Sequence, residues 1–214
     1  MELLRHRAAS ISKADTIAGP TLRRARRRAI ARFVPTWLTL LLWLAAFPPA
    51  RELHAQTQVG SVEYQVKAAF LLNFTKFVEW PAAAFPAPDA PITICVIGED
   101  PFGAILDRTI EGERVNRHGV SARRLLAAGD PRSCHILFIS QSEQERFAQI
   151  VSRLRGSSVL TVSELPGFAD TGGMIEFLIE EGKARFYINA ATTEGAGLKL
   201  SSRLLRVAKE VKGS

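Results

Sequence analysis

Few side chains in this sequence have the types and spacing that catalysis or nucleotide binding requires. The segment 98–103 (GEDPFG) follows an apolar run, where nucleotide-binding loops begin. It has neither a G-x-G-x-x-G pattern nor the Lys-Ser/Thr of a P-loop. Pro101 also removes a backbone N–H that a phosphate cradle uses. We therefore interpret the segment as a turn from a strand into a helix.

The histidines and serines show no better arrangement. His118 and His135 lack H-x-x-x-H or Cys/His spacing, so no zinc site is expected, and His135 in its apolar run reads as a core residue. Ser140 lacks the G-x-S-x-G context of a nucleophile, and we interpret it as a helix cap. Carboxylates are plentiful, but the sequence alone places no two of them at the distance that acid/base catalysis requires. The sequence thus predicts no catalytic residue, metal or cofactor, and favours a binding or regulatory protein.

Cys95 and Cys134 are the two cysteines of the chain. In an oxidising compartment an even pair is expected to join where geometry permits, with two buried free thiols as the alternative. The spacing is not C-x-x-C, so a thioredoxin-like redox role is not expected.

The net positive charge is confined to one end of the chain. Residues 1–56 carry ten Lys/Arg and three Asp/Glu, whereas the remainder carries eighteen of each. The remainder has no basic footprint, so no nucleic-acid partner is expected.

The basic N-terminal segment has the pattern of an export signal. An arginine block precedes an apolar run of twelve residues, 36–47 (TWLTLLLWLAAF), which Pro48 ends. As a helix this run rises about 18 Å, short of the roughly 30 Å hydrocarbon core, so it fits a signal peptide better than a membrane span. We expect residues 1–55 to be a signal peptide cleaved near Ala55 and residues 56–61 to be a short linker. An uncleaved membrane anchor is the alternative.

The rest of the chain alternates buried strands with short helices. Residues 62–79 have helical spacing without Gly or Pro, and their apolar residues extend round most of the circumference, so this helix should pack on more than one side. One short helix is predicted from Asp100-Pro101 to about residue 110. A second is predicted to begin at a capping box formed by Ser142 and Glu145 and to extend to residue 154. Strands are predicted at 92–98, 114–120, 134–139 and 158–162. This alternation predicts an α/β domain with a largely parallel sheet.

The last forty or so residues follow a different pattern. Two runs with period-two alternation, 174–179 and 183–188, predict a hairpin. Residues 189–194 are expected to form a short helix or a turn. A final helix begins at Ser201 or Ser202 and extends to about residue 211. Lys199, Arg203 and Arg206 are expected to share one face of it, either as a solvated stripe or as a site for a partner or an anion.

Six blocks together resemble the YfiR/HmsC-like family of bacterial periplasmic proteins. They are VKAAFLLNFTKFVEWP (66–81), ITICVIGEDPFG (92–103), CHILFIS (134–140), VLTVSELPGFADTGGMIEF (159–177), ARFYIN (184–189) and GLKLSSRLLRVAK (197–209). The resemblance implies a Rossmann-like domain over 62–211, often dimeric. It also implies a family disulfide between Cys95 and Cys134. A second disulfide of some members has no counterpart here, so redox gating that needs it is not expected.

The resemblance further implies a function. The family's best-studied members repress an inner-membrane diguanylate cyclase through its periplasmic sensor portion, which lowers cyclic-di-GMP and exopolysaccharide output, and the resemblance implies the same role here. Two alternatives stay open. One is a periplasmic small-ligand sensor, serving another receptor such as a histidine kinase, that uses the crevice near 98–102 and 140–143. The other is an exported hydrolase that uses Ser140 or a carboxylate.

Overall fold

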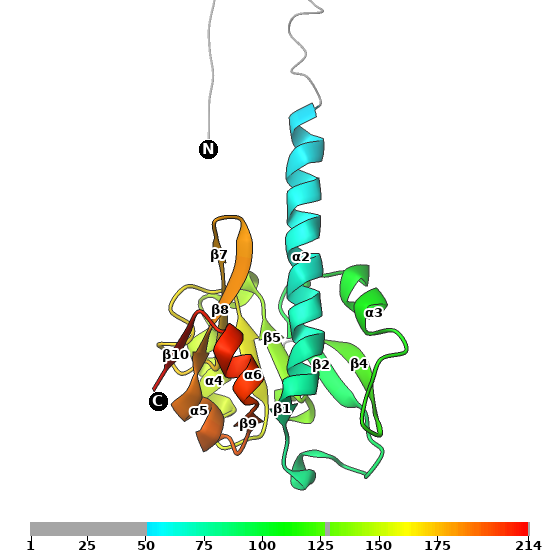
Figure 1. Cartoon of the computed structure of the whole chain (residues 1–214), viewed down its shortest axis with the longest axis vertical. Coiled ribbons are helices and arrows are strands. Elements are labelled where there is room, and N and C mark those ends of the chain that lie inside the picture. Colours follow the sequence, from blue (N-terminus) through cyan, green and yellow to red (C-terminus); the bar gives the residue numbers. More distant parts are fainter. Residues whose placement is uncertain (1–50, 127–128, 214) are drawn as a thin grey trace, which may run out of the picture. The chain divides into compact units, whose positions relative to one another are not determined.

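The fold is built around an eight-stranded sheet that carries helices on both faces (Figure 1). The computed structural model describes residues 51–126 and 129–213, with side chains from residue 62 onward. The strands follow the spatial order β10-β8-β7-β6-β5-β2-β4-β3. Their bounds are β2 Ile92–Ile97, β3 Arg114–Val115, β4 His118–Leu125, β5 Ile136–Ile139, β6 Leu160–Ser163, β7 Ile175–Glu180, β8 Lys183–Asn189 and β10 Glu210–Lys212. A separate antiparallel pair joins β1 (Val78–Glu79) to β9 (Lys199–Leu200).

Most neighbouring strands of the large sheet run parallel. The exceptions are the hairpins β3–β4 and β7–β8. The chain leaves β2 for β4 on one side and then returns to the other side of β2 as β5. This reversal of strand order is typical of doubly wound sheets, and it confirms the predicted Rossmann-like α/β fold.

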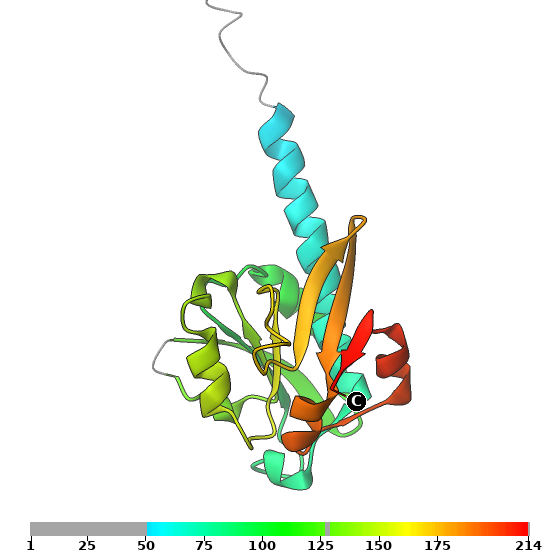
Figure 2. The same ribbon diagram turned by 90° about the vertical axis from the view of Figure 1, so that its left-hand side faces the viewer.

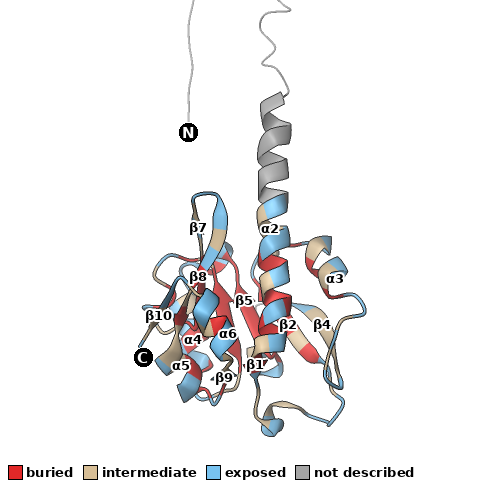
Figure 3. Ribbon diagram, viewed as in Figure 1, coloured by how far each residue is buried: buried red, intermediate tan, exposed pale blue. Residues whose placement is uncertain are grey.

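Alternate residues of the central strands supply two separate cores. On β2, Ile94 and Val96 join the core beneath α2 (Arg51–Phe77), whereas Cys95 and Ile97 join the core beneath α4 (Phe147–Arg153). The short helices α3 (Ala104–Ile110) and α6 (Ser202–Val207) lie on the α2 side. Burial on both faces explains why the central strands are continuous apolar runs, and Figure 3 shows the buried residues concentrated there.

Helix α2 is longer than predicted. It begins at Arg51, so residues 56–61, expected as a linker, lie within it. The helix and the β7–β8 hairpin both extend beyond the sheet in the same direction (Figure 2). Residues 1–50 of the predicted signal peptide lie outside the described residues, and cleavage near Ala55 stays a prediction.

A buried ion pair fastens α2 to the carboxyl end of β6. The Lys67 ammonium contacts the carboxylates of Glu63 and Glu164. The side chains of Lys67 and Glu164 are 3% and 7% exposed. The Tyr64 hydroxyl donates to Glu164 at 3.0 Å. Burial, followed by the nearby Glu164 carboxylate, raises the pKa of Tyr64 above its ordinary value. The pair explains how a lysine is accommodated on the inner side of the helix.

The predicted start of the helix after β2 is wrong. Helix α3 begins at Ala104, and Asp100 lies before it. One Asp100 oxygen accepts from the Phe102 N–H at 2.9 Å, and the other accepts from Arg124 of β4 at 2.8 Å. The carboxylate therefore stabilises the turn and joins it to β4 instead of capping a helix. The predicted strand 114–120 is also divided, because β3 and β4 form a hairpin with Asn116 at φ 55° between them.

The predicted capping box at Ser142 and Glu145 is likewise wrong. Ser140 precedes the 3-10 turn η3 (Gln141–Glu143), and α4 starts only at Phe147. The Ser142 hydroxyl accepts instead from the Glu99 N–H at 2.8 Å, which ties the two loops together.

The C-terminal hairpin is confirmed, as is the short helix after it, α5 (Ala190–Gly195), which Asn189 caps. Ser201 caps α6 by accepting from the Leu204 N–H at 3.2 Å. The helix ends at Val207, earlier than predicted, because the chain then becomes edge strand β10 and pairs with β8.

Candidate functional site

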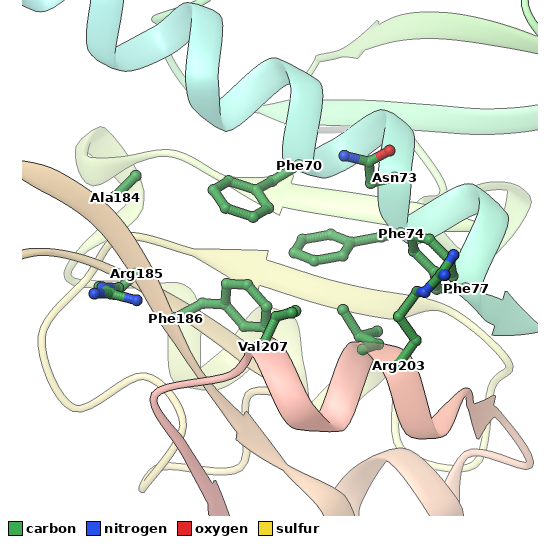
Figure 4. Close-up of a pocket in the computed structure, with 10 residues that line it drawn as sticks. Phe70, Asn73, Phe74, Phe77, Ala184, Arg185, Phe186, Arg203 and Val207 are labelled. Carbon is green, nitrogen blue, oxygen red and sulfur yellow. The ribbon is translucent and has the colours of Figure 1, made fainter.

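An apolar groove opens where α2, α6 and strand β8 meet (Figure 4). Its volume is about 360 Å³. Ten residues line it: Phe70, Asn73, Phe74 and Phe77 of α2, Ala184, Arg185 and Phe186 of β8, and Arg203, Leu204 and Val207 of α6. We call this the aromatic groove. A cavity of this size that carries few polar groups is suited to an apolar side chain or a small apolar ligand.

The floor of the aromatic groove is a packed aromatic cluster. The Phe186 ring meets Phe70 and Phe74 edge-on, with ring centroids 5.3 and 5.4 Å apart. Phe74 and Phe186 are buried, whereas Phe70 and Phe77 are half-buried and face the opening. The rings hold one another by edge-to-face contacts, so the floor is rigid and preformed.

The rim of the aromatic groove is positively charged. The Arg203 guanidinium lies 5.9 Å from the centre of the Phe77 ring, whereas the side chain of Arg185, the other cationic lining residue, points away from Phe186 (Figure 4). None of the ten lining residues is acidic. Within the described residues neither arginine forms an ion pair, so their charges are available to an anionic group. The groove therefore combines an apolar pocket with a cation, Arg203, at its mouth.

The predicted basic stripe is only partly assembled here. Arg203 lines the aromatic groove, and Arg206 lies three residues further along α6. Lys199 lies in β9 and pairs with Glu79, so it is not on the helix, because α6 starts at Ser202. All three side chains are exposed. Their part in binding a partner or an anion stays a proposal.

Sequence reasoning did not identify the phenylalanines of the groove. Phe70, Phe74 and Phe77 recur at helical spacing, which is equally typical of an ordinary core helix. The only sequence feature that pointed to these phenylalanines was the wide apolar surface of the helix, which predicted that it packs on more than one side. The partly open position of Phe70 and Phe77 depends on where β8 and α6 end.

The disulfide between Cys95 and Cys134 is present, with the two Cα atoms 5.9 Å apart. It joins β2 to the start of β5 on the α4 side of the sheet, and both residues are buried. Arg123, opposite Cys95 on β4, places a guanidinium nitrogen 3.7 and 3.6 Å from the two sulfurs. The bridge therefore lies on the face of the sheet opposite to the aromatic groove.

His135 is a core residue, as predicted, although only one ring nitrogen is satisfied. Nδ1 accepts from the Thr93 N–H at 3.1 Å, whereas the buried Nε2 has no partner in the described residues. The Phe85 ring lies between His135 and His118, with centroids 4.5 and 4.2 Å away. Burial, and secondly the charge of His118, lowers the pKa of His135 to about 4. The ring is thus neutral at ordinary pH.

The crevice expected for a small ligand is filled. A Cβ at Gly98 would lie 2.4 Å from the Ser142 hydroxyl and 2.9 Å from Cγ of Glu143. Phe102 and Ser140 are buried at the same place. The loops after β2 and β5 therefore pack directly against each other, and the prediction of a ligand crevice at 98–102 and 140–143 is not supported.

Comparison with known families identifies the domain. A family model described as YfiR/HmsC-like matches residues 64–209. The chain belongs to the YfiR/HmsC-like family. The matched region includes every lining residue of the aromatic groove and both cysteines of the bridge. No curated protein sequence matches the chain.

Membership of the YfiR/HmsC-like family indicates a periplasmic regulatory protein. In the part of the chain that the structure describes, no helix has the length and apolar character needed to span a membrane. A regulatory protein acts by recognising other molecules, and the aromatic groove is a candidate site for that recognition.

Proposed function

We propose that this protein is exported to the periplasm and represses an inner-membrane diguanylate cyclase by binding its periplasmic portion. Repression lowers cyclic-di-GMP and, with it, biofilm and exopolysaccharide output. Family membership supports the class of protein, and the aromatic groove with its basic rim is the observation that supports a binding site.

The energy that such repression needs is modest. A regulator shifts a receptor between states only by the difference in its affinity for the two states. A hundredfold change in cyclase activity corresponds to about 2.7 kcal/mol of that difference. Burying one large apolar side chain contributes roughly 1.5–3 kcal/mol. One anchor side chain that enters the aromatic groove in a single receptor state is therefore sufficient.

Arg203 is the groove residue that best tests this proposal. Its guanidinium lies over the Phe77 ring and has no acidic partner in the described residues, so Arg203→Glu reverses the charge of the rim without breaking an ion pair. Arg153→Glu is the matched control, because Arg153 is exposed on α4, on the opposite face of the sheet.

The experiment measures cyclic-di-GMP in a strain that lacks the gene. The deletion is expected to raise cyclic-di-GMP, and the wild-type gene and Arg153→Glu to lower it again. Arg203→Glu and a version without residues 1–55 are expected to fail. An unchanged level in the deletion strain refutes cyclase repression and favours the alternative of a ligand sensor for another receptor. Full activity of Arg203→Glu refutes the assignment of the groove.

A further inference from the structure

Strand β8 is longer than the strand that covers its outer edge. β10 pairs with Tyr187, Ile188 and Asn189 only. On the other side of β8, all of β7 pairs with β8 residues Lys183 to Ile188. The outer edge of β8 at residues 183–186 therefore has no neighbouring strand within the described residues. Figure 2 shows this half of the hairpin extending beyond the rest of the sheet.

The direction of the backbone groups at this edge follows from the hydrogen bonds that flank it. The Phe186 carbonyl accepts from the Lys209 N–H at 2.9 Å, so the backbone groups of Phe186 point outward. Successive residues of a strand alternate in direction, so those of Ala184 point outward as well. Among the described residues, the N–H and C=O of Ala184 and the N–H of Phe186 thus have no backbone partner, and they lie in register to accept a further strand.

The open edge of β8 forms one side of the aromatic groove. Ala184 and Phe186 line the groove, and their side chains lie on the α2 face of the sheet. Exposed apolar side chains gather around it. Val207 of the groove is 54% exposed, and Ile179, which pairs with Ala184, is 47% exposed. Val66 is 41% exposed and lies one helical turn before Phe70. Such a group of exposed apolar side chains is typical of an interaction site.

The opposite face of the same edge carries two exposed cations and, across from Lys183 on β7, the carboxylate of Glu180. Lys183 and Arg185 alternate with Ala184 and Phe186, so their side chains lie on the other face. Both are exposed, and neither forms an ion pair within the described residues. A strand added here meets apolar surface on one face and two unpaired cations on the other.

We propose that β8 binds its partner by β-strand addition: an extended segment of the partner pairs with residues 183–186 and alternates apolar and acidic side chains. The apolar side chains enter the aromatic groove, and the carboxylates meet Lys183 and Arg185. Main-chain hydrogen bonds supply affinity, and the alternation supplies specificity. The inference rests on the proposed function, since it describes how the regulated receptor is bound at the same site.

A second copy of this chain is a poorer occupant than an acidic strand. Two β8 edges that pair with each other bring Lys183 and Arg185 of one copy close to those of the other. Like charges opposite each other across a strand pair are destabilising. Charge complementarity therefore favours a partner strand that carries Asp or Glu.

The first test alters only the edge. Ala184→Pro removes the outward N–H that an added strand needs, while the hydrogen bonds from β8 to β7 stay intact, and proline is tolerated on edge strands. Ala184→Ser keeps the N–H and is the matched control. In the deletion strain, Ala184→Ser is expected to lower cyclic-di-GMP as wild type does, and Ala184→Pro is not. Melting curves of the exported proteins establish that both variants fold.

The second test uses wild-type protein, so it does not depend on the folding of a variant. The probe is a fluorescein-labelled peptide of about eight residues in which Phe and Val alternate with Glu. Two isomers are N-methylated, one on every apolar residue and one on every Glu, because only alternate N–H groups of a strand face β8. One isomer is expected to lose at least roughly tenfold in affinity, and the other to bind as the unmodified peptide does.

The outcomes separate this inference from the proposed function. Equal binding of both isomers, no binding at about 1 mM peptide, or self-association of the protein through β8 overturns strand addition. Protection of the Ala184 and Phe186 amides from hydrogen exchange on peptide binding supports it. If the peptide binds at the edge but wild-type protein has no effect on cyclic-di-GMP, the proposed function fails and the edge serves a different receptor.

Discussion

Replacement of Lys67 by Met is expected to destabilise the domain by about 3–5 kcal/mol, because loss of one partner leaves a buried charge uncompensated. The side chains of Lys67 and Glu164 are 3% and 7% exposed, so water cannot replace the ammonium. Among the described residues, Glu164 then keeps only the Tyr64 hydroxyl as a donor, at 3.0 Å. Glu63, which shares the ammonium, adds repulsion. Met fills the space of the lysine stem, so the loss reports charge and not a cavity.

Lys76→Met is the matched control on the same helix. Lys76 pairs with Glu113 at 3.0 Å, but the two side chains are 39% and 37% exposed. An exposed pair of this kind contributes about 0–1 kcal/mol. The double variant Lys67→Met/Glu164→Gln removes both charges of the buried pair and is expected to recover most of the stability that Lys67→Met loses.

Urea unfolding, followed by the fluorescence of Trp80, measures these free energies by linear extrapolation. Trp80 is the one tryptophan after residue 55. For a domain of this size the loss corresponds to a fall in Tm of roughly 6–20 °C. Equal losses for Lys67→Met and Lys76→Met, or a loss below about 1 kcal/mol for the former, refute the reasoning that burial decides the strength of the pair.

Three other predictions follow from buried groups. An unfolded imidazole gains its proton near pH 6.5 and native His135 only near pH 4, so stability falls as the pH falls through this window, by about 3 kcal/mol. In urea titrations at several pH values, His135→Leu should lack this part of the slope. Cys95→Ser opens a bridge of sequence separation 39 and should cost about 4 kcal/mol of unfolding free energy. Gly173→Ala places a Cβ 2.2 Å from the buried Phe168 ring and should cost about 1–3 kcal/mol, whereas Gly195→Ala, which meets nothing within 4 Å, should be nearly neutral in the same assay.

Each of these predictions has a contrary result. A parallel pH dependence for wild type and His135→Leu would show that His135 titrates normally in the fold. Full stability of reduced wild-type protein would contradict a stabilising role for the bridge. Gly173→Ala as stable as Gly195→Ala would mean that the Phe168 ring moves aside without cost.

The strands and the final architecture were predictable because local pattern and burial agree. The apolar runs of β2 and β5 are buried on both faces, which is what parallel central strands require. The hairpin β7–β8 was predictable from its period-two alternation. Helix boundaries failed where a polar side chain found a distant partner. Asp100 bonds to Arg124, and Ser142 bonds to the Glu99 amide, so neither caps a helix.

The candidate site was much less predictable than the fold. Arg203 was identified by charge alone, and only the structure places it over Phe77. Phe70 and Phe74 look like any core residues, and the opening beside them exists because α6 ends at Val207. Helical spacing reports that a side chain faces inward, but not whether another element covers it.

The sequence by itself determined the class of fold, the family and the pairing partners of the bridge, because these depend on residue types and on their order. Tertiary structure alone decided that β10 covers only part of β8, so that the edge at residues 183–186 stays open beside the aromatic groove. Whether a strand edge or an aromatic ring is exposed depends on whether a second element covers it. It depends on where each element ends in space, which no single segment of the chain encodes.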